Sequence, residues 1–340
     1  MRFPHLAINP FSLLATLVIL LFSFSVQAES KKLLILDSQS GDPYDAAREA
    51  MLEELEAQGF QIKKNLEVKR FTIGNKIGLG LRLLRTEAAK HDVVFVNGTM
   101  ANKAAHQFGF NDSRYKFVFC SVTDPVGSGL VAALNQPSTS NFTGISYGLP
   151  VDVRLKFLNE VLPEAKTIGL IYADMPQSIS YIGWLKAALK KPEFSHLNII
   201  FRKIPFVHGD NGHIRMARLM EQQIDELSSQ VDAFITPSDQ LGTKREYAQV
   251  ITQYSNKPLM GLSEKEISEG WGAHFGVYPD QKRSGKIAGE MITRLFNGEK
   301  IQNITPVSPA AVYGINQEKS TKIKLDYPDS VLSKVGGNLF

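Results

Sequence analysis

The chain contains a single cysteine, Cys120, among its 340 residues. One cysteine excludes an internal disulfide, even in a compartment that would permit one. Because Cys120 lies far from the N-terminus, we expect no lipid-modified cysteine at the start of the mature protein. Cys120 also ends an apolar run, which favours a packed thiol over a reactive nucleophile.

Motifs of common catalytic and metal sites are missing as well. The sequence has no G-x-S-x-G elbow, no Walker loop, no G-x-G-x-x-G after a predicted strand and no H-E-x-x-H. His208 and His213 flank residues 209–212 at a spacing that fits no standard zinc site, so a solvated loop is favoured there over a metal site. We therefore predict a protein that is not an enzyme and that needs no cofactor and no metal.

Charge of one sign does not accumulate anywhere along the chain. The 38 basic and 34 acidic residues are interspersed, and no basic block alternates with aromatic residues. This pattern argues against a nucleic-acid partner. A hydrophobic content of 43% is ordinary for a folded protein, and the length beyond residue 28 favours two lobes over one core.

The N-terminus has the pattern of an export signal. Arg2 precedes an uncharged apolar run over residues 11–26, and Val26-Gln27-Ala28 places small side chains where signal peptidase reads them. We predict a signal peptide over residues 1–28, cleavage after Ala28 and a periplasmic mature protein. The alternative is a membrane anchor, but the run of 16 residues is shorter than the ~20 that a spanning helix needs.

Strand and helix patterns alternate through both halves of the mature chain, which predicts parallel sheets covered by helices. In the first half we expect strands at 33–36, 67–72, 93–96 and 117–120, with helices at 45–59, 76–90 and 100–108. In the second half we expect strands at 167–172, 198–206, 233–236 and 258–262, with helices at 152–162, 181–190, 212–227 and 243–254. A third segment, 270–277, leads into a helix over 280–297.

The stretch from 117 to 146 joins the two halves. Its sequence is FVFCSVTDPVGSGLVAALNQPSTSNFTGIS, in which a buried strand stops at Asp124-Pro125 and a polar loop leads to a short strand at 142–145. In α/β proteins such a loop follows the carboxyl end of a strand, where ligands bind. A plain connection is the alternative.

This stretch resembles a family of ABC-transporter substrate-binding proteins through residues 123–131 (TDPVGSGLV) and 141–146 (NFTGIS). The similarity continues in 155–158, 168–172, 232–239 and 285–298, and so covers most of the mature chain. The resemblance implies a type I periplasmic binding fold, and some members of that family bind aromatic amino acids.

The expected fold is thus α/β, with two doubly wound parallel-sheet lobes joined by a hinge of several crossings. The resemblance implies that one lobe contains residues 29–146 plus about 278–305. The other lobe then contains residues 147–277 plus about 306–335. The chain would cross between lobes near Tyr147, Tyr278 and Pro306, with the ligand cleft between the lobes.

Ligand contacts are expected at strand ends and crossings, on both halves of the chain. The candidates are Ser40, Tyr44, Thr99, Met100, Thr123, Asp124, Tyr147, Tyr172, Ser178, Asp239 and His274. The helix that begins near Thr99 offers free N–H groups for a carboxylate, although Thr99 as a simple N-cap is the alternative. Trp184 fits the core by its spacing, whereas Trp271 is expected to line the cleft or to shield the hinge.

Asp239 follows a strand of the second half and would face the cleft from the opposite side. An ionised carboxylate there accepts hydrogen bonds from an ammonium group, which suits the cationic end of an amino acid. Tyr44, Tyr147 and Tyr172 would supply aromatic walls. The alternative is that Asp239 caps the helix that starts near Thr243.

These observations predict a periplasmic solute-binding protein that delivers a small ligand, an amino acid or a related metabolite, to an ABC importer. The partners would be the small-molecule ligand and the transporter permease, and we expect a monomer. Closure of the lobes requires contacts from both lobes at once, because a ligand shifts the equilibrium only by binding the closed state better. The alternative is a ligand-sensing partner of a membrane signalling receptor.

Overall fold

The computed structural model describes residues 30–209 and 211–340. The predicted signal peptide over 1–28 therefore lies outside the described residues. In the described part of the chain, no helix combines the length and the apolar character needed to cross a membrane.

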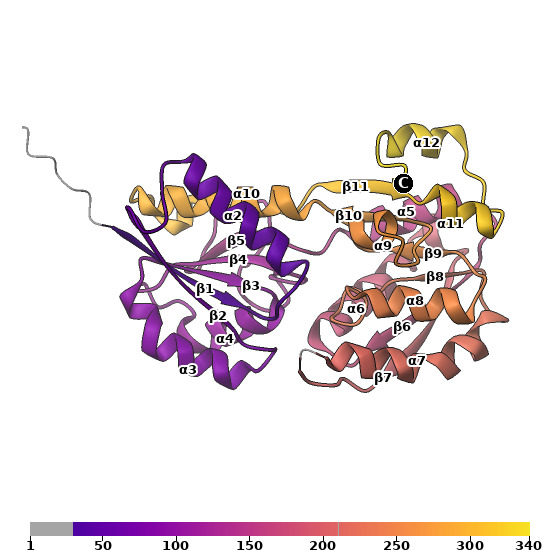
Figure 1. The fold of residues 1–340 in the computed structure, drawn as a ribbon, viewed down its shortest axis with the longest axis horizontal. Helices are drawn as coiled ribbons and strands as arrows, with labels where there is room; N and C mark the ends of the chain where they lie inside the picture. Colours follow the sequence, from indigo (N-terminus) through magenta and orange to yellow (C-terminus); the bar gives the residue numbers. More distant parts are fainter. Residues whose placement is uncertain (1–29, 210) are drawn as a thin grey trace, which may run out of the picture. The chain divides into compact units, whose positions relative to one another are not determined.

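The first sheet has the strand order β2-β1-β3-β4-β5, and all of its neighbouring strands pair in parallel (Figure 1). Its strands are β1 (Lys31–Asp37), β2 (Leu66–Thr72), β3 (Val93–Asn97), β4 (Phe117–Val122) and β5 (Phe142–Ser146). The connecting helices are α2 (Tyr44–Ala57), α3 (Ile77–Glu87), η1 (Ala88–Lys90) and α4 (Thr99–Gly109). The central strands are buried along their whole length, as expected for a sheet covered on both faces.

The second sheet has the order β11-β10-β9-β8-β6-β7. Its strands are β6 (Thr167–Ala173), β7 (Asn198–Ile204), β8 (Ala233–Ile235), β9 (Leu259–Gly261), β10 (Phe275–Pro279) and β11 (Ala311–Ile315). The helices of this half are α5 (Val151–Val161), α6 (Pro176–Ala188), η2 (Pro192–Phe194), α7 (Gly212–Ser228), α8 (Arg245–Tyr254) and α9 (Glu264–Ser268). The two-lobe α/β prediction is confirmed, with one difference: β11 pairs antiparallel with β10, so this sheet is mixed.

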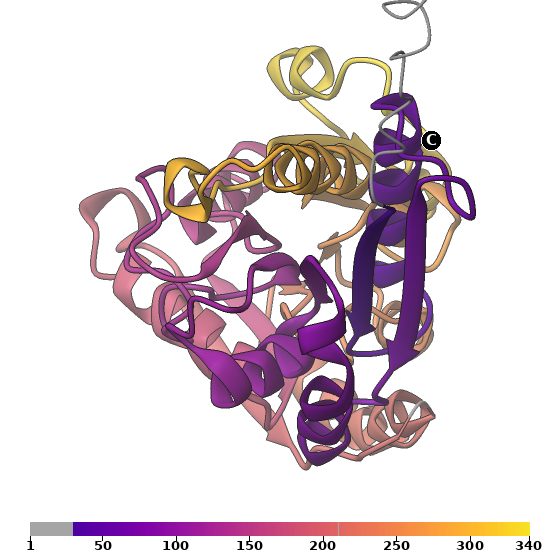
Figure 2. The same ribbon diagram turned by 90° about the vertical axis from the view of Figure 1, so that its left-hand side faces the viewer.

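After β10 the chain leaves the second sheet and packs on the first. Helix α10 (Gln281–Phe296) lies against α2, as both views show (Figure 1 and Figure 2). Gly285 and Gly289 face α2, because a Cβ on Gly285 would lie 2.2 Å from the carbonyl oxygen of Ala47. These glycines allow the two helix backbones to approach closely.

Three segments connect the sheets, and they hydrogen-bond to each other. The amide of Ser146 donates to the carbonyl of Val307, and the amide of Val307 donates to the carbonyl of Gly144. Pro279 at the end of β10 is opposite Ala311 in β11. The crossings near residues 147, 279 and 307 therefore form one paired hinge.

The C-terminal tail is more structured than the sequence indicates. After η3 (Ile301–Asn303) and β11 come α11 (Gln317–Lys322) and α12 (Asp329–Val335), which the sequence analysis does not predict. Val331 and Val335 of α12 pack in the same core as Phe157 of α5. A further correction concerns α6, which begins at Pro176, five residues before its expected start at Tyr181.

Candidate functional site

Four neighbouring cavities lie between the strand-end loops of the two sheets in the described part of the chain, and the fourth, of about 590 Å³, shares Thr123 with the central one. The central cavity measures about 20 Å³ and is lined from both sheets and from the first crossing. It shares Pro43, Tyr147 and Thr243 with a cavity of about 230 Å³, here called the hinge cavity because Tyr147 and Pro279 line it. It shares Thr99 and Gln177 with a third cavity of about 340 Å³, here called the polar cavity.

Five of the predicted ligand residues meet at the central cavity. They are Tyr44, Thr99, Thr123, Tyr147 and Asp239. The first three follow strands of the first sheet, Asp239 follows β8, and Tyr147 lies on the first crossing. The geometry therefore brings together residues that are up to 195 positions apart in the sequence.

The N-terminus of α4 forms one wall of this cavity. Its N-cap is Gly98 and not Thr99, and Gly98 has a φ of 96°, in the left-handed region that glycine tolerates. A Cβ there would lie 2.5 Å from Oγ of Ser38, which accepts the amide of Ala101 at 2.9 Å. The hydroxyl oxygen of Thr99, instead of capping its own helix, lies 3.5 Å from the amide nitrogen of Thr123.

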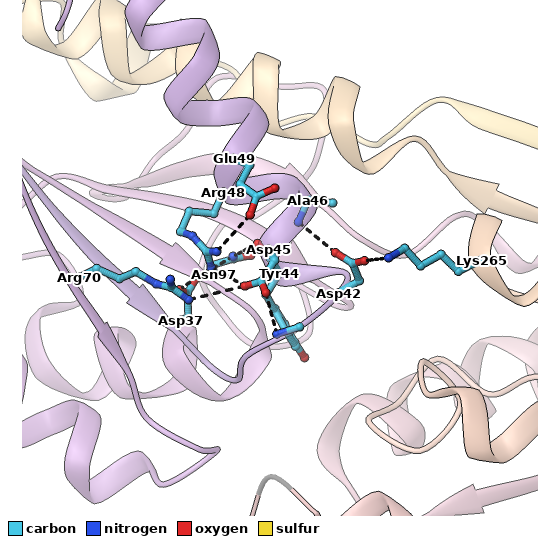
Figure 3. A network of polar contacts seen from close by, with 11 residues as sticks. Asp37, Asp42, Tyr44, Asp45, Ala46, Arg48, Glu49, Arg70, Asn97 and Lys265 are labelled. Carbon is cyan, nitrogen blue, oxygen red and sulfur yellow. Dashed lines mark hydrogen bonds and ion pairs between the residues drawn. The ribbon is translucent and has the colours of Figure 1, made fainter. Parts of the chain in front are cut away.

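A buried polar network fixes the loop that carries Tyr44 (Figure 3). Asp37 is fully buried and accepts hydrogen bonds from Arg48 at 3.0 Å, Arg70 at 2.8 Å and Asn97 at 2.9 Å. Asn97 also donates to the carbonyl of Tyr44 at 2.9 Å. Burial raises the pKa of Tyr44 to about 12, so its phenol stays protonated and can donate a hydrogen bond at neutral pH.

Asp239 is engaged by its own lobe. Its Oδ2 accepts the amide of Ala173 at 3.0 Å and the hydroxyl of Ser178 at 2.8 Å, and its Oδ1 accepts the amides of Leu241 and Gly242 at 2.9 Å each. The four bonds tie the β8 loop to the end of β6 and the start of α6. These bonds give Asp239 and Ser178 a role in supporting the loop, and the expected salt link of Asp239 to a ligand stays a prediction. The capping alternative does not fit, because α8 begins at Arg245.

The three atoms best placed to meet a ligand belong to neighbours of the predicted residues. Oε1 of Gln177, Oγ of Ser238 and Nε2 of Gln240 are buried and have no hydrogen-bond partner within residues 30–209 and 211–340. All three residues line the central cavity. Buried polar atoms without partners are costly, so these atoms mark a place where a polar ligand would complete the structure.

Gln240 also connects the two sheets. Its Oε1 accepts the side-chain amide of Asn75 at 2.8 Å, across the gap between the lobes. Ser121, on the opposite wall, has a φ of 53°, which is uncommon for a residue other than glycine and is typical of functional sites. In the described arrangement, the hydrogen bond between Asn75 and Gln240 therefore joins the two walls of the central cavity.

The remaining predicted residues lie away from the central cavity. Met100 packs in the core, Ser40 is exposed, Tyr172 packs against the core of the second lobe, and Asp124 lines the polar cavity. His274 lines none of these four cavities: it is buried at the start of β10, and its Nδ1 accepts the amide of Leu259 at 3.0 Å. Burial lowers the pKa of His274 to about 4, so the ring is neutral at neutral pH.

The predicted ligand residues do not include Gln177, Ser238, Gln240 or Ser121. Ser238 and Gln240 flank Asp239 in the same loop. The sequence analysis selected Asp239 for its charge and did not select its two neutral neighbours. Gln177 follows Pro176, a residue type favoured at the first position of a helix, and an earlier start for α6 would have placed Gln177 at the cleft. Among the described residues, no group of three or more histidine, cysteine or acidic side chains could hold a metal ion.

Comparisons with known proteins agree with this architecture. A family model described as "ABC transporter substrate binding protein" matches residues 32–337. A tyrosine-binding protein of Clostridioides difficile (strain R20291) is 24% identical over 265 residues, which cover 76% of this chain and 71% of that protein.

Two solved structures have the same fold. One is the ABC domain in complex with L-Trp from Streptococcus pneumonia, with a TM-score of 0.77 and 20% identity over 92% of this chain and 100% of that one. The other is a conserved domain protein from Vibrio cholerae, with a TM-score of 0.78 and 19% identity over the same shares. Since the family model spans most of the 340-residue chain, the chain belongs to the family of ABC transporter substrate binding proteins.

Proposed function

We propose that this protein is a periplasmic receptor that binds an amino acid, with aromatic amino acids as the leading class, and delivers it to an ABC importer. The observation that carries the proposal is the set of three unpartnered polar atoms on Gln177, Ser238 and Gln240, three residues that line the central cavity together with Thr99 at the N-terminus of α4. The names of the relatives, a tyrosine-binding protein and a complex with L-Trp, support the choice of ligand.

The two ends of an amino acid suit the two sides of this cavity. The N-terminus of α4 and Nε2 of Gln240 are donors, which match a carboxylate. Oε1 of Gln177 and the hydroxyl of Ser238 can accept from an ammonium group. In this proposal the ligand ammonium contacts neutral acceptors, and Asp239 supports them from behind.

Binding requires the lobes to move. A cavity of about 20 Å³ has room for about one water molecule, so an amino acid cannot enter it without a separation of the loops. We propose that the lobes, 29–146 with about 278–305 and 147–277 with about 306–335, open at the paired hinge and close on the ligand. The permease would recognise the closed form. A signalling receptor as the docking partner remains the second candidate, with the same ligand chemistry.

Isothermal titration of the mature protein, residues 29–340, with L-tyrosine, L-tryptophan and L-phenylalanine tests the ligand class. We expect binding that Gln177→Met weakens by at least tenfold, since a lost hydrogen bond to a charged group is worth about 1.5–3 kcal/mol. The melting temperature of the free variant should stay or rise, because the change removes a buried atom without a partner.

Gln249→Met is the matched control, because Gln249 is exposed on α8 and lines none of the four cavities. It should bind like the unmodified protein. The absence of binding for every amino acid would contradict the proposed function, and unchanged affinity in Gln177→Met would contradict the assigned contacts.

A further inference from the structure

The hinge cavity continues directly from the central cavity. Pro43, Tyr147 and Thr243 line both, so a ligand whose polar end sits in the central cavity can extend past these residues. The hinge cavity measures about 230 Å³, whereas the central cavity is far too small for a large side chain. The side chain of an amino acid ligand therefore needs a neighbouring cavity, and the hinge cavity shares more lining residues with the central cavity than the polar cavity or the fourth cavity does.

The walls of the hinge cavity suit an aromatic ring. Leu262 and Trp271 contribute apolar and aromatic surface from the second lobe, and Tyr147 and Pro279 contribute it from the hinge. Flat rings pack well against such surfaces, and apolar walls with a few polar groups are typical of small-molecule sites. Trp271 is held in place by a hydrogen bond from its Nε1 to Glu269 at 3.2 Å.

The polar cavity on the other side has a different chemistry. Lys103, His106, Gln107 and Asp124 line it, and neither tryptophan nor tyrosine is among its lining residues. Charged residues line the hinge cavity as well, so the two cavities differ in their aromatic rings: of the two, only the hinge cavity is lined by Tyr147 and Trp271. The hinge cavity therefore offers the better packing surface for a ring.

Gln281, the first residue of α10, adds a polar element to the hinge cavity. It lines the cavity, and both its Nε2 and its Oε1 are buried without a hydrogen-bond partner among the residues that the structure describes. The side-chain amide of Gln281 can therefore donate a hydrogen bond from Nε2 to a ligand acceptor or accept one at Oε1 from a ligand donor. A ring that carries a hydrogen-bonding atom would satisfy at least one of them, and a plain phenyl ring would satisfy neither.

We propose that the hinge cavity is the side-chain subsite of the ligand, and that Gln281 selects an aromatic ring with a hydrogen-bonding atom, a phenol or an indole, over a plain phenyl ring. This inference rests on the proposed function, because it assumes that an amino acid occupies the central cavity. It assigns to Trp271 a place in the wall of the subsite and to Gln281 the discrimination between rings.

The location of the subsite is tested by filling each cavity in turn. Ser268→Trp places a large side chain in the hinge cavity, and Ser180→Trp places the same side chain in the polar cavity. In calorimetric titrations, Ser268→Trp should lower the affinity for L-tyrosine by at least tenfold, and Ser180→Trp should change it less than threefold. Loss of binding in Ser180→Trp with normal binding in Ser268→Trp would overturn the assignment.

The role of Gln281 is tested by the choice between rings, a ratio that a general loss of stability does not change. The unmodified protein should bind L-tyrosine at least tenfold more tightly than L-phenylalanine, and in Gln281→Met the ratio should fall to about one. Equal affinities in the unmodified protein, or an unchanged ratio in the variant, would refute the inference. Either of these two results would refute only the role of Gln281 and would leave the proposed function intact. A protein that binds no amino acid would contradict both the proposed function and the role of Gln281.

Discussion

Asp239 shows how a residue at a predicted site can serve the site by supporting its loop. Its side chain is 3% exposed and accepts four hydrogen bonds from Ala173, Ser178, Leu241 and Gly242. Burial raises its pKa, while the same hydrogen bonds act in the opposite direction. The carboxylate thus holds the loop that presents Ser238 and Gln240 to the central cavity.

We expect Asp239→Asn to reduce the free energy of unfolding by roughly 1–3 kcal/mol, because an amide nitrogen in place of Oδ2 would leave the N–H of Ala173 without its acceptor. Urea denaturation measures this loss. The control is Asp225→Asn, which makes the same change on the exposed face of α7 and should leave stability within about 0.5 kcal/mol. Normal stability combined with lost affinity in Asp239→Asn would show that Asp239 contacts the ligand.

Glu266 is a second buried carboxyl group near the site. Its Oε2 accepts the amides of Leu262 and Ser263, while its Oε1 has no partner among the described residues. Burial raises the pKa of Glu266 to about 7, against the effect of those amides and of the nearby charge of Arg154. The folded protein therefore keeps a proton that the unfolded chain releases near pH 4.5.

The sign of the pH effect follows from this difference in bound protons. Between about pH 4.5 and 7 the folded state binds more protons, so the contribution of Glu266 to stability falls as the pH rises. Comparing the unfolding free energies of Glu266→Gln and the unmodified protein at pH 5 and 8 isolates this contribution from that of His274. The variant should gain up to about 3 kcal/mol relative to the unmodified protein between these pH values. A constant difference would contradict the raised pKa.

At the scale of elements, the contact between α2 and α10 depends on glycine. A Cβ on Gly285 would lie 2.2 Å from the carbonyl oxygen of Ala47 and 2.9 Å from Cβ of Ala50. The helices would have to separate, which would disturb the packing of α10 on the first lobe next to the hinge. We expect Gly285→Ala to cost about 1–3 kcal/mol of stability in urea denaturation, despite the better helix propensity of alanine.

Gly183→Ala in α6 is the matched control, since a Cβ at that position would meet nothing within 4 Å. At position 183 only the helix propensity changes, and the substitution should raise the free energy of unfolding by about 0.5–1 kcal/mol. Similar effects of the two substitutions would show that the close approach of α2 and α10 does not limit stability.

The elements most accessible from the sequence were those with strong local patterns. The continuous apolar run of β4 and the spaced apolar positions of α7 gave correct types and nearly correct bounds. The short tail elements β11, α11 and α12 have weak local patterns and owe their stability to contacts with distant segments, such as that of Val331 with the core of the second lobe. For the same reason the site was found only in part: strand ends could be predicted, but which side chains would lack partners depends on the packed structure.

At the scale of the whole molecule, polar side chains of the two lobes contact each other in the described arrangement. Asn75 donates to Gln240, and Lys265 of α9 forms an ion pair with Asp42 in the loop after β1 (Figure 3). A partly exposed ion pair contributes at most about 1 kcal/mol and a neutral hydrogen bond about 0.5–1.5 kcal/mol, so these two contacts favour closure only weakly and a bound ligand would add to them. We expect saturating L-tyrosine to lower the radius of gyration in small-angle scattering. An identical scattering curve with and without a ligand that binds would indicate a rigid site.

The most direct test of the central claim is a crystal structure of residues 29–340 with L-tyrosine. Our account predicts that the carboxylate lies between the N-terminus of α4 and Nε2 of Gln240, and that the ammonium group contacts Gln177 and Ser238. The ring should occupy the hinge cavity beside Trp271. A ligand bound outside the gap between the lobes, or one whose ammonium group pairs with Asp239 while Gln177 and Ser238 stay without partners, would contradict it.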